Sequence, residues 1–153
     1  MSSNSYSFRS EWRLAAPAAT VYEVLERLPD YPAWWPEVRE VTPAGPEAYA
    51  LVVRSGLPYT LRFVTTQGRR DPEQRVLEAN LTGDLTGFSR WTIHESSNGA
   101  LAVFEEDVEA HKALLRRLAV VGRPAFRYNH RLMMRHGEHG LRTYLAGYSA
   151  ARG

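Results

Sequence analysis

The sequence predicts a single α+β domain, residues 1–153, in which a curved antiparallel sheet of seven strands packs against a long C-terminal helix over a cavity. Three observations support this fold class. Short strand-like segments separated by turn residues fill most of residues 37–110. A helical pattern then runs through residues 113–146. The length of 153 residues fits one domain and allows a sizeable core.

The N-terminal part predicts one strand and two short helical elements. Residues 6–14 alternate apolar and polar side chains and include aromatics, as a strand does. Residues 17–28 carry apolar side chains at helical spacing, and Pro29 ends this helix. Residues 31–36 form a compact aromatic turn. Because adjacent side chains of a strand point to opposite faces, we expect one of Trp34 and Trp35 to pack in the core and the other to cover an opening.

The middle of the chain predicts an antiparallel meander, because strand-like segments of roughly ten residues alternate with short turns. The turns contain Gly, Pro, Asp or Asn. The expected strands span residues 37–43, 47–55, 58–69, 73–82, 85–95 and 100–110.

The C-terminal helix is expected to break or kink at Gly122 and Pro124. Beyond the break, helical spacing separates two faces. The face expected toward the sheet carries Phe126, Asn129, His130, Met133, Gly137, Gly140 and Tyr144. The face expected in solvent carries Arg127, Arg131, Arg135, Glu138 and Arg142.

The formal net charge of +2 hides an asymmetry. Residues 1–110 carry a net −6, and residues 111–153 carry +8. One explanation is an internal match, with the basic helix near the acidic strand at Glu105, Glu106, Asp107 and Glu109, and this is the one we expect. The other is an anionic partner such as a lipid headgroup, an acidic ligand or a nucleic acid.

The candidate site combines polar groups with apolar surroundings. A buried polar side chain costs about 1–3 kcal/mol if it has no partner, so Asn129 and His130 each need one. The partner is either the backbone or water, as in an ordinary core, or a polar group of a ligand. Gly137 leaves space over the sheet, either for a cavity or for close packing. Either phase of strand 100–110 turns a carboxylate inward, and we choose the phase with Phe104 and Glu106 inward because it buries the larger side chain. The expected cavity lining is Trp35, Leu61, Phe63, Trp91, Phe104, Asn129, Met133 and Gly137.

Several function classes find little support. The chain has no cysteine, which excludes disulfides and thiolate chemistry. A metal site is not expected, because His130 and His139 fall on opposite sides of the helix. No phosphate-binding glycine loop is present, so no cofactor is expected. The Arg face lacks interleaved aromatics, which argues against nucleic acid. Without a signal-peptide pattern or a long apolar run, we expect a cytoplasmic protein with no stable membrane insertion.

Three stretches carry a family resemblance: residues 16–25 (Ala-Pro-Ala-Ala-Thr-Val-Tyr-Glu-Val-Leu), residues 31–36 (Tyr-Pro-Ala-Trp-Trp-Pro), and residues 126–130 (Phe-Arg-Tyr-Asn-His) running into 134–138 (Met-Arg-His-Gly-Glu). With the order of elements, they resemble the START-like (SRPBCC) helix-grip superfamily, in particular bacterial polyketide cyclase/dehydrase-like members. The resemblance implies a START/Bet v 1-like sheet gripping the helix around a hydrophobic cavity. Such proteins bind lipids, polyketides, sterols, quinones or hormone-like molecules, and only some are enzymes.

Three hypotheses follow. The first is a binding protein for a hydrophobic or aromatic small molecule, lipid- or polyketide-like. The second is a cyclase/dehydratase or aromatase-type enzyme that uses His130 and Glu106 as acid/base groups, because imidazole titrates near neutral pH. The third is an interaction module that uses the Arg face. The sequence leaves open whether the chain forms a homodimer.

Overall fold

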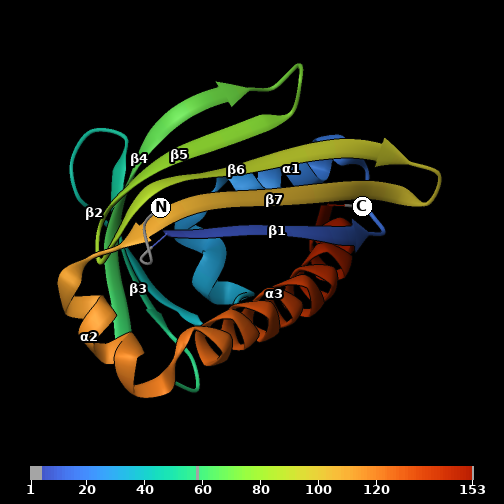
Figure 1. Ribbon diagram of the computed structural model, residues 1–153. Coiled ribbons are helices and arrows are strands. Elements are labelled where there is room, and N and C mark those ends of the chain that lie inside the picture. The colour runs from blue at the N-terminus through green and yellow to red at the C-terminus, as the bar shows by residue number, and fades with distance from the viewer. Residues whose placement is uncertain (1–4, 58, 153) are drawn as a thin grey trace.

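The computed structural model describes residues 5–57 and 59–152, and it confirms the predicted fold class (Figure 1). Seven strands form one antiparallel sheet in the order β1-β7-β6-β5-β4-β3-β2. The strands are β1 (Ser5–Leu14), β2 (Val38–Pro43), β3 (Ala48–Arg54), β4 (Thr60–Asp71), β5 (Val76–Gly83), β6 (Leu85–Ser96) and β7 (Gly99–Ala110). The helices are α1 (Ala18–Glu26), the 3-10 helix η1 (Leu28–Ala33), α2 (Lys112–Val121) and α3 (Arg123–Arg152).

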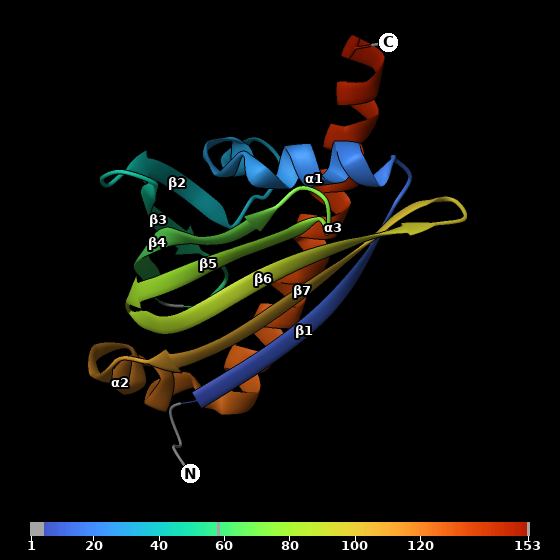
Figure 2. The same ribbon diagram turned by 90° about the horizontal axis from the view of Figure 1, so that it is seen from above.

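The sheet curves around α3, which runs along its concave side (Figures 1 and 2). Consecutive strands from β2 to β7 pair with one another, as short turns require. The first strand closes the order at the far edge, because β1 pairs with β7 over its whole length, from Ser5 opposite Glu109 to Leu14 opposite Ala100. The start of the chain therefore lies beside the segment that leads into the C-terminal helices.

The predicted break between the two C-terminal helices is confirmed at Gly122. Its φ of 82° is a left-handed conformation that glycine adopts without a steric cost, and it ends α2. Pro124 then lies in the first turn of α3, where proline is tolerated. The turn directs α3 across the concave side of the sheet (Figure 1).

Both tryptophans of the aromatic turn are buried, so the expectation that one would cover an opening is wrong. Trp34 is 4% exposed and Trp35 is 5% exposed, and their rings stack with centroids 5.4 Å apart. The expectation assumed extended backbone. At the end of η1 the backbone of Trp34 is not extended, with φ −131° and ψ −13°, so the two neighbouring rings can share one side.

The expected match between the basic helix and the acidic strand is also wrong for most of its groups. Glu105 pairs with Arg90 of the neighbouring strand β6, which also binds Glu78 of β5. Another acidic residue of β7, Glu106, does contact α3, through His130. Glu105, which the sequence analysis expected to pair with the basic helix, is therefore neutralised by an arginine of the neighbouring strand instead.

Glu138 of α3 was expected in solvent, and the structure places it against the edge of the sheet instead. Its Oε2 accepts hydrogen bonds from the backbone N–H of Arg13, at 2.9 Å, and from Arg142, at 3.2 Å. Arg142 Nε in turn donates to the backbone carbonyl of Arg13 at 2.9 Å. These contacts satisfy backbone groups that an edge strand leaves unpaired.

Candidate functional site

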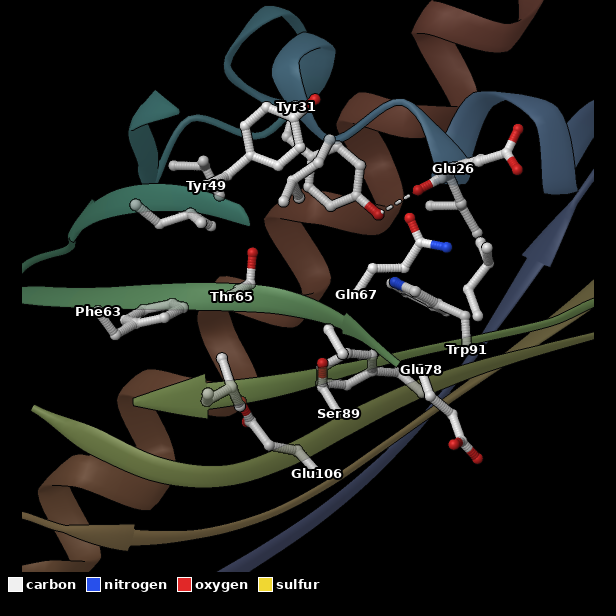
Figure 3. Close-up of a pocket in the computed structure, with 18 of the residues that line it drawn as sticks. Glu26, Tyr31, Tyr49, Phe63, Thr65, Gln67, Glu78, Ser89, Trp91 and Glu106 are labelled. Carbon is white, nitrogen blue, oxygen red and sulfur yellow. Dashed lines mark hydrogen bonds between the residues drawn. The ribbon is translucent and has the colours of Figure 1, made fainter. Parts of the chain in front are cut away.

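A cavity of about 200 Å³ lies between the sheet and α3 (Figure 3). The strand register explains its position. Glu106 of β7, Ser89 of β6, Ala79 of β5 and Gln67 of β4 lie opposite one another in one row across the sheet. The two central members, Ser89 and Ala79, have small side chains. The floor of the cavity is therefore low at the centre of the sheet, where larger side chains would reach the helix.

The wall of the cavity is mostly apolar. Five of the residues predicted as lining residues do line it: Trp35, Phe63, Trp91, Phe104 and Met133. Phe104 and Glu106 both face it, as in the phase chosen for this strand from the sequence. Additional apolar contacts come from α1, η1 and β3, which the sequence did not indicate: Leu25, Leu28, Tyr31, Tyr49, Leu51 and Val53.

The two residues considered as acid/base groups, His130 and Glu106, contact each other inside this cavity. His130 Nε2 lies 3.2 Å from Glu106 Oε1, and the two side chains are only 10% and 13% exposed. The imidazole stacks on Phe8, with ring centroids 3.6 Å apart and an interplanar angle of 11°. Phe8 lies opposite Glu106 in the β1–β7 register, so the strand pairing positions both contacts of His130. The ring is therefore held in place between an aromatic face and a carboxylate.

A second, smaller cavity of about 30 Å³ adjoins the first at His130 and Met133. Leu61 and Asn129, predicted for the main cavity, line this smaller one. Asn129 Nδ2 donates a short hydrogen bond to Ser55 Oγ, so this amide already has one partner. The hydroxyl of Tyr59 is buried there and has no hydrogen-bond partner among the residues that the structure describes. Burial raises the pKa of Tyr59 and keeps the phenol neutral.

Gly137 lines neither cavity, in contrast to its prediction as a ligand-binding residue. A Cβ atom built on it would lie 2.6 Å from Cε2 of Trp35 and 2.8 Å from Cη2 of Trp12. The space that this glycine leaves is filled by the indole rings. Of the two explanations considered for Gly137, close packing is the one that the structure adopts.

The cavity opens between the end of α1 and the strands β3 and β4. Its exposed lining residues Glu47, Arg69 and Arg70 lie there, with the half-exposed Glu26 and Gln67. Arg70 Nε lies 3.5 Å from Glu26 Oε2 and so joins β4 to α1 across the opening. This opening could not be predicted from hydrophobic alternation, because an irregularity in the β4–β5 register between Gln67 and Arg70 alters which side chains face inward.

A second contact between a histidine and a carboxylate, which the sequence did not indicate, lies outside the cavity. His136 Nδ1 is 2.6 Å from Glu37 Oε2, and this carboxylate is only 10% exposed. His130 and His136 thus face different carboxylates. Within residues 5–57 and 59–152, no group of three His, Asp or Glu side chains is arranged to hold a metal ion. No helix in that part of the chain is long and apolar enough to span a bilayer.

This arrangement can hold an apolar molecule and offer it a few polar groups. The cavity walls supply dispersion contacts, while His130, Glu106 and Ser89 supply hydrogen-bonding groups along its lining. Figure 3 shows Glu106 and Ser89 on neighbouring strands of the sheet. A histidine beside a carboxylate can also exchange a proton with a bound molecule.

Comparisons with known proteins agree with this fold. A solved aromatase/cyclase from a Streptomyces species has a TM-score of 0.71 at 15% identity and covers 92% of this chain and 93% of its own. A START superfamily protein from Mycobacterium smegmatis has a TM-score of 0.71 at 18% identity, covering 94% and 98%. A di-domain aromatase/cyclase has a TM-score of 0.69 at 18% identity, covering 92% of this chain and 50% of its own.

At these identities the structural matches show the fold. The search of curated protein sequences gave no match. A family model, however, matches residues 6–145, which is nearly the whole chain, and it describes polyketide cyclases, dehydrases and lipid transport proteins. The chain therefore belongs to the polyketide cyclase/dehydrase and lipid transport family.

Proposed function

We propose that this protein binds an apolar or aromatic small molecule in the cavity between the sheet and α3. The observation that carries the proposal is the combination of an apolar wall with one buried polar pair. The wall is contributed by aromatic and aliphatic side chains from the strands β2 to β7 and from α1, η1 and α3, and the pair is His130 with Glu106. Cavities that bind small molecules have this composition.

The size of the cavity narrows the ligand class. An engineered cavity of about 150 Å³ accepts benzene, and typical ligand pockets run from about 300 to 1,000 Å³. A volume of about 200 Å³ fits one aromatic ring or two fused rings. A longer molecule would extend through the opening at Glu26 and Arg70. The polar end of the ligand, a hydroxyl or carbonyl, would lie against His130, Glu106 and Ser89.

A titration with 2-naphthol tests this proposal, because its two fused rings and one hydroxyl match the cavity. We expect saturable binding to one site, with a change in the emission of Trp35 and Trp91. Ala79→Leu raises the floor and should weaken binding at least tenfold. Ala50→Leu is the matched control: the same change on β3, at a position that lines neither cavity. The proposal fails if the wild type does not bind, or if both variants bind equally well.

Catalysis is a second candidate, and the proximity of His130 to Glu106 favours it. In this alternative the chain is an enzyme of the cyclase/dehydratase or aromatase type. His130 takes a proton from a carbon next to a carbonyl of a β-keto substrate, and Glu106 orients the imidazole. The aromatase/cyclase structures that resemble this chain support the candidate only through their shared fold.

His130→Ala separates catalysis from binding. Naphthalene has no polar group, so its binding should survive the substitution and report an intact cavity. Turnover of a β-keto substrate, followed by the absorbance of the aromatic product, should fall by about 10²-fold or more if His130 is the acid/base group. Unchanged turnover removes His130 from the mechanism and leaves the binding proposal standing.

A further inference from the structure

The exposed surface of α2 and of the first half of α3 differs from the rest of the molecule in its charge. We call this surface the basic corner and define it by seven residues: Lys112, Arg116, Arg117, Val120, Tyr128, Arg131 and Arg135. All seven are exposed. The chain between Glu109 and Glu138 contains no Asp or Glu. The two helices meet at Gly122 at one end of the sheet, so the corner projects from the fold (Figures 1 and 2).

The cations of the basic corner have no ion-pair partner among the described residues. Elsewhere on the molecule, seven arginines pair with nearby carboxylates, among them Arg9 with Glu11, Arg27 with Glu23 and Arg90 with Glu78. The adjacent Arg123 and Arg127 fold back over the ring of Tyr6 on β1 and add positive charge beside the corner. A positive potential that the protein itself does not neutralise favours an anionic partner.

The basic corner also exposes apolar groups. Val120 is 82% exposed and Tyr128 is 59% exposed, and they are the two exposed large hydrophobic side chains of the part of the chain that the structure describes. Helical spacing places each beside a cation: Val120 four residues after Arg116, and Tyr128 three residues before Arg131. Arginines and lysines interleaved with an aliphatic side chain and a tyrosine are typical of helices that lie on a membrane surface.

We propose that the basic corner docks the protein peripherally on an anionic lipid bilayer. Lys112 and the four arginines would contact lipid phosphates, while Val120 and Tyr128 would enter the interface between headgroups and acyl chains. A nucleic acid would use the same cations, but it would gain nothing from a valine at the corner. The surface is separate from the cavity, because none of its seven residues lines either one. The inference therefore holds whether or not the proposed ligand is bound.

Flotation of the full chain with vesicles tests this proposal. Vesicles of phosphatidylcholine with about one-third phosphatidylglycerol should carry the protein, vesicles of phosphatidylcholine alone should not, and high salt should release it. Each cation near an anionic surface contributes about a fivefold change in partitioning, so Arg131→Gln with Arg135→Gln should weaken binding roughly 25-fold. Val120→Ser keeps the charge and should still weaken binding several-fold.

The matched control is Arg39→Gln with Arg62→Gln, which removes the same charge from exposed positions on β2 and β4. It should change partitioning by less than about threefold. Circular dichroism confirms that every variant is folded. The proposal is overturned if the wild type does not float with anionic vesicles, or if the control loses as much binding as the corner variant. It is also overturned if Val120→Ser has no effect while the protein binds duplex DNA more tightly than vesicles.

Discussion

The two halves of α3 pack differently against the rest of the molecule. The second half touches its neighbours closely: a Cβ atom on Gly140 would lie 1.8 Å from the backbone oxygen of Trp34, and Gly137 faces the rings of Trp12 and Trp35. The first half, around His130 and Met133, lies over a cavity. Glycines allow the helix to approach closely at one end, and small floor residues leave space beneath part of it at the other.

We infer from this difference that the close contacts of the second half of α3 hold the helix in place and so keep the cavity under the first half open. Trp12 joins that half together, since its ring contacts those of Trp34, Trp35 and Trp91 with centroids 4.8 to 6.1 Å apart. Trp35 Nε1 also donates to the carbonyl of Met133 at 2.9 Å. With the helix fixed there, the space over Ser89 and Ala79 stays open instead of collapsing.

Trp12→Ala should have the largest effect on stability. The residue is 2% exposed, and truncation of a buried tryptophan costs about 3–5 kcal/mol. Chemical denaturation followed by circular dichroism measures the loss. A loss below about 1 kcal/mol would mean that the tryptophan cluster does not fix the helix.

Gly140→Ala should destabilise the fold by about 2 kcal/mol, because the new Cβ would overlap the backbone of Trp34 and force the helix away. Gly147→Ala in the same helix is the control: its Cβ meets nothing within 4 Å, so the better helix propensity of alanine should stabilise by up to about 1 kcal/mol. Opposite signs in thermal melts confirm the comparison. Equal stabilisation by both substitutions contradicts it.

Phe63→Ala, in the wall of the open half, should cost less than Trp12→Ala. This side chain is only partly buried, and the cavity already removes some of its contacts, so we expect a loss of about 1–2 kcal/mol. The enlarged cavity should also accept larger aromatic molecules, which titration with ligands of increasing size would measure. A loss as large as that of Trp12→Ala would indicate that the two halves are equally well packed.

Much of the fold could be predicted because local signals specify it. Turn residues separate the strands, and Gly122 with Pro124 breaks the helix. The inward position of Asn129 and His130 followed from helical spacing. The sequence placed His130 and Glu106 on surfaces that face each other, but it could not show that the two side chains are in contact. The structure shows that contact.

Features that depend on contacts between distant elements could not be predicted. The contact between Glu37 and His136 joins two residues that no local pattern relates. The role of Gly137 depends on where the indole of Trp35 lies, and that position is set by the turn after η1. The opening at Glu26 and Arg70 results from an irregular strand register, which hydrophobic alternation does not reveal.

The hydrogen bond from Trp35 to the carbonyl of Met133 limits the motion of α3 and so bears on the route by which a ligand would reach the cavity. A helix held at Met133 and Gly140 cannot swing aside without breaking both attachments, and collective motions of that kind take microseconds to milliseconds. Rotation of the Arg70 and Glu26 side chains takes nanoseconds or less. A molecule that binds as proposed would therefore enter and leave past the ion pair between β4 and α1. Its residence time would depend on its contacts with the cavity wall more than on the motion of the side chains at the opening.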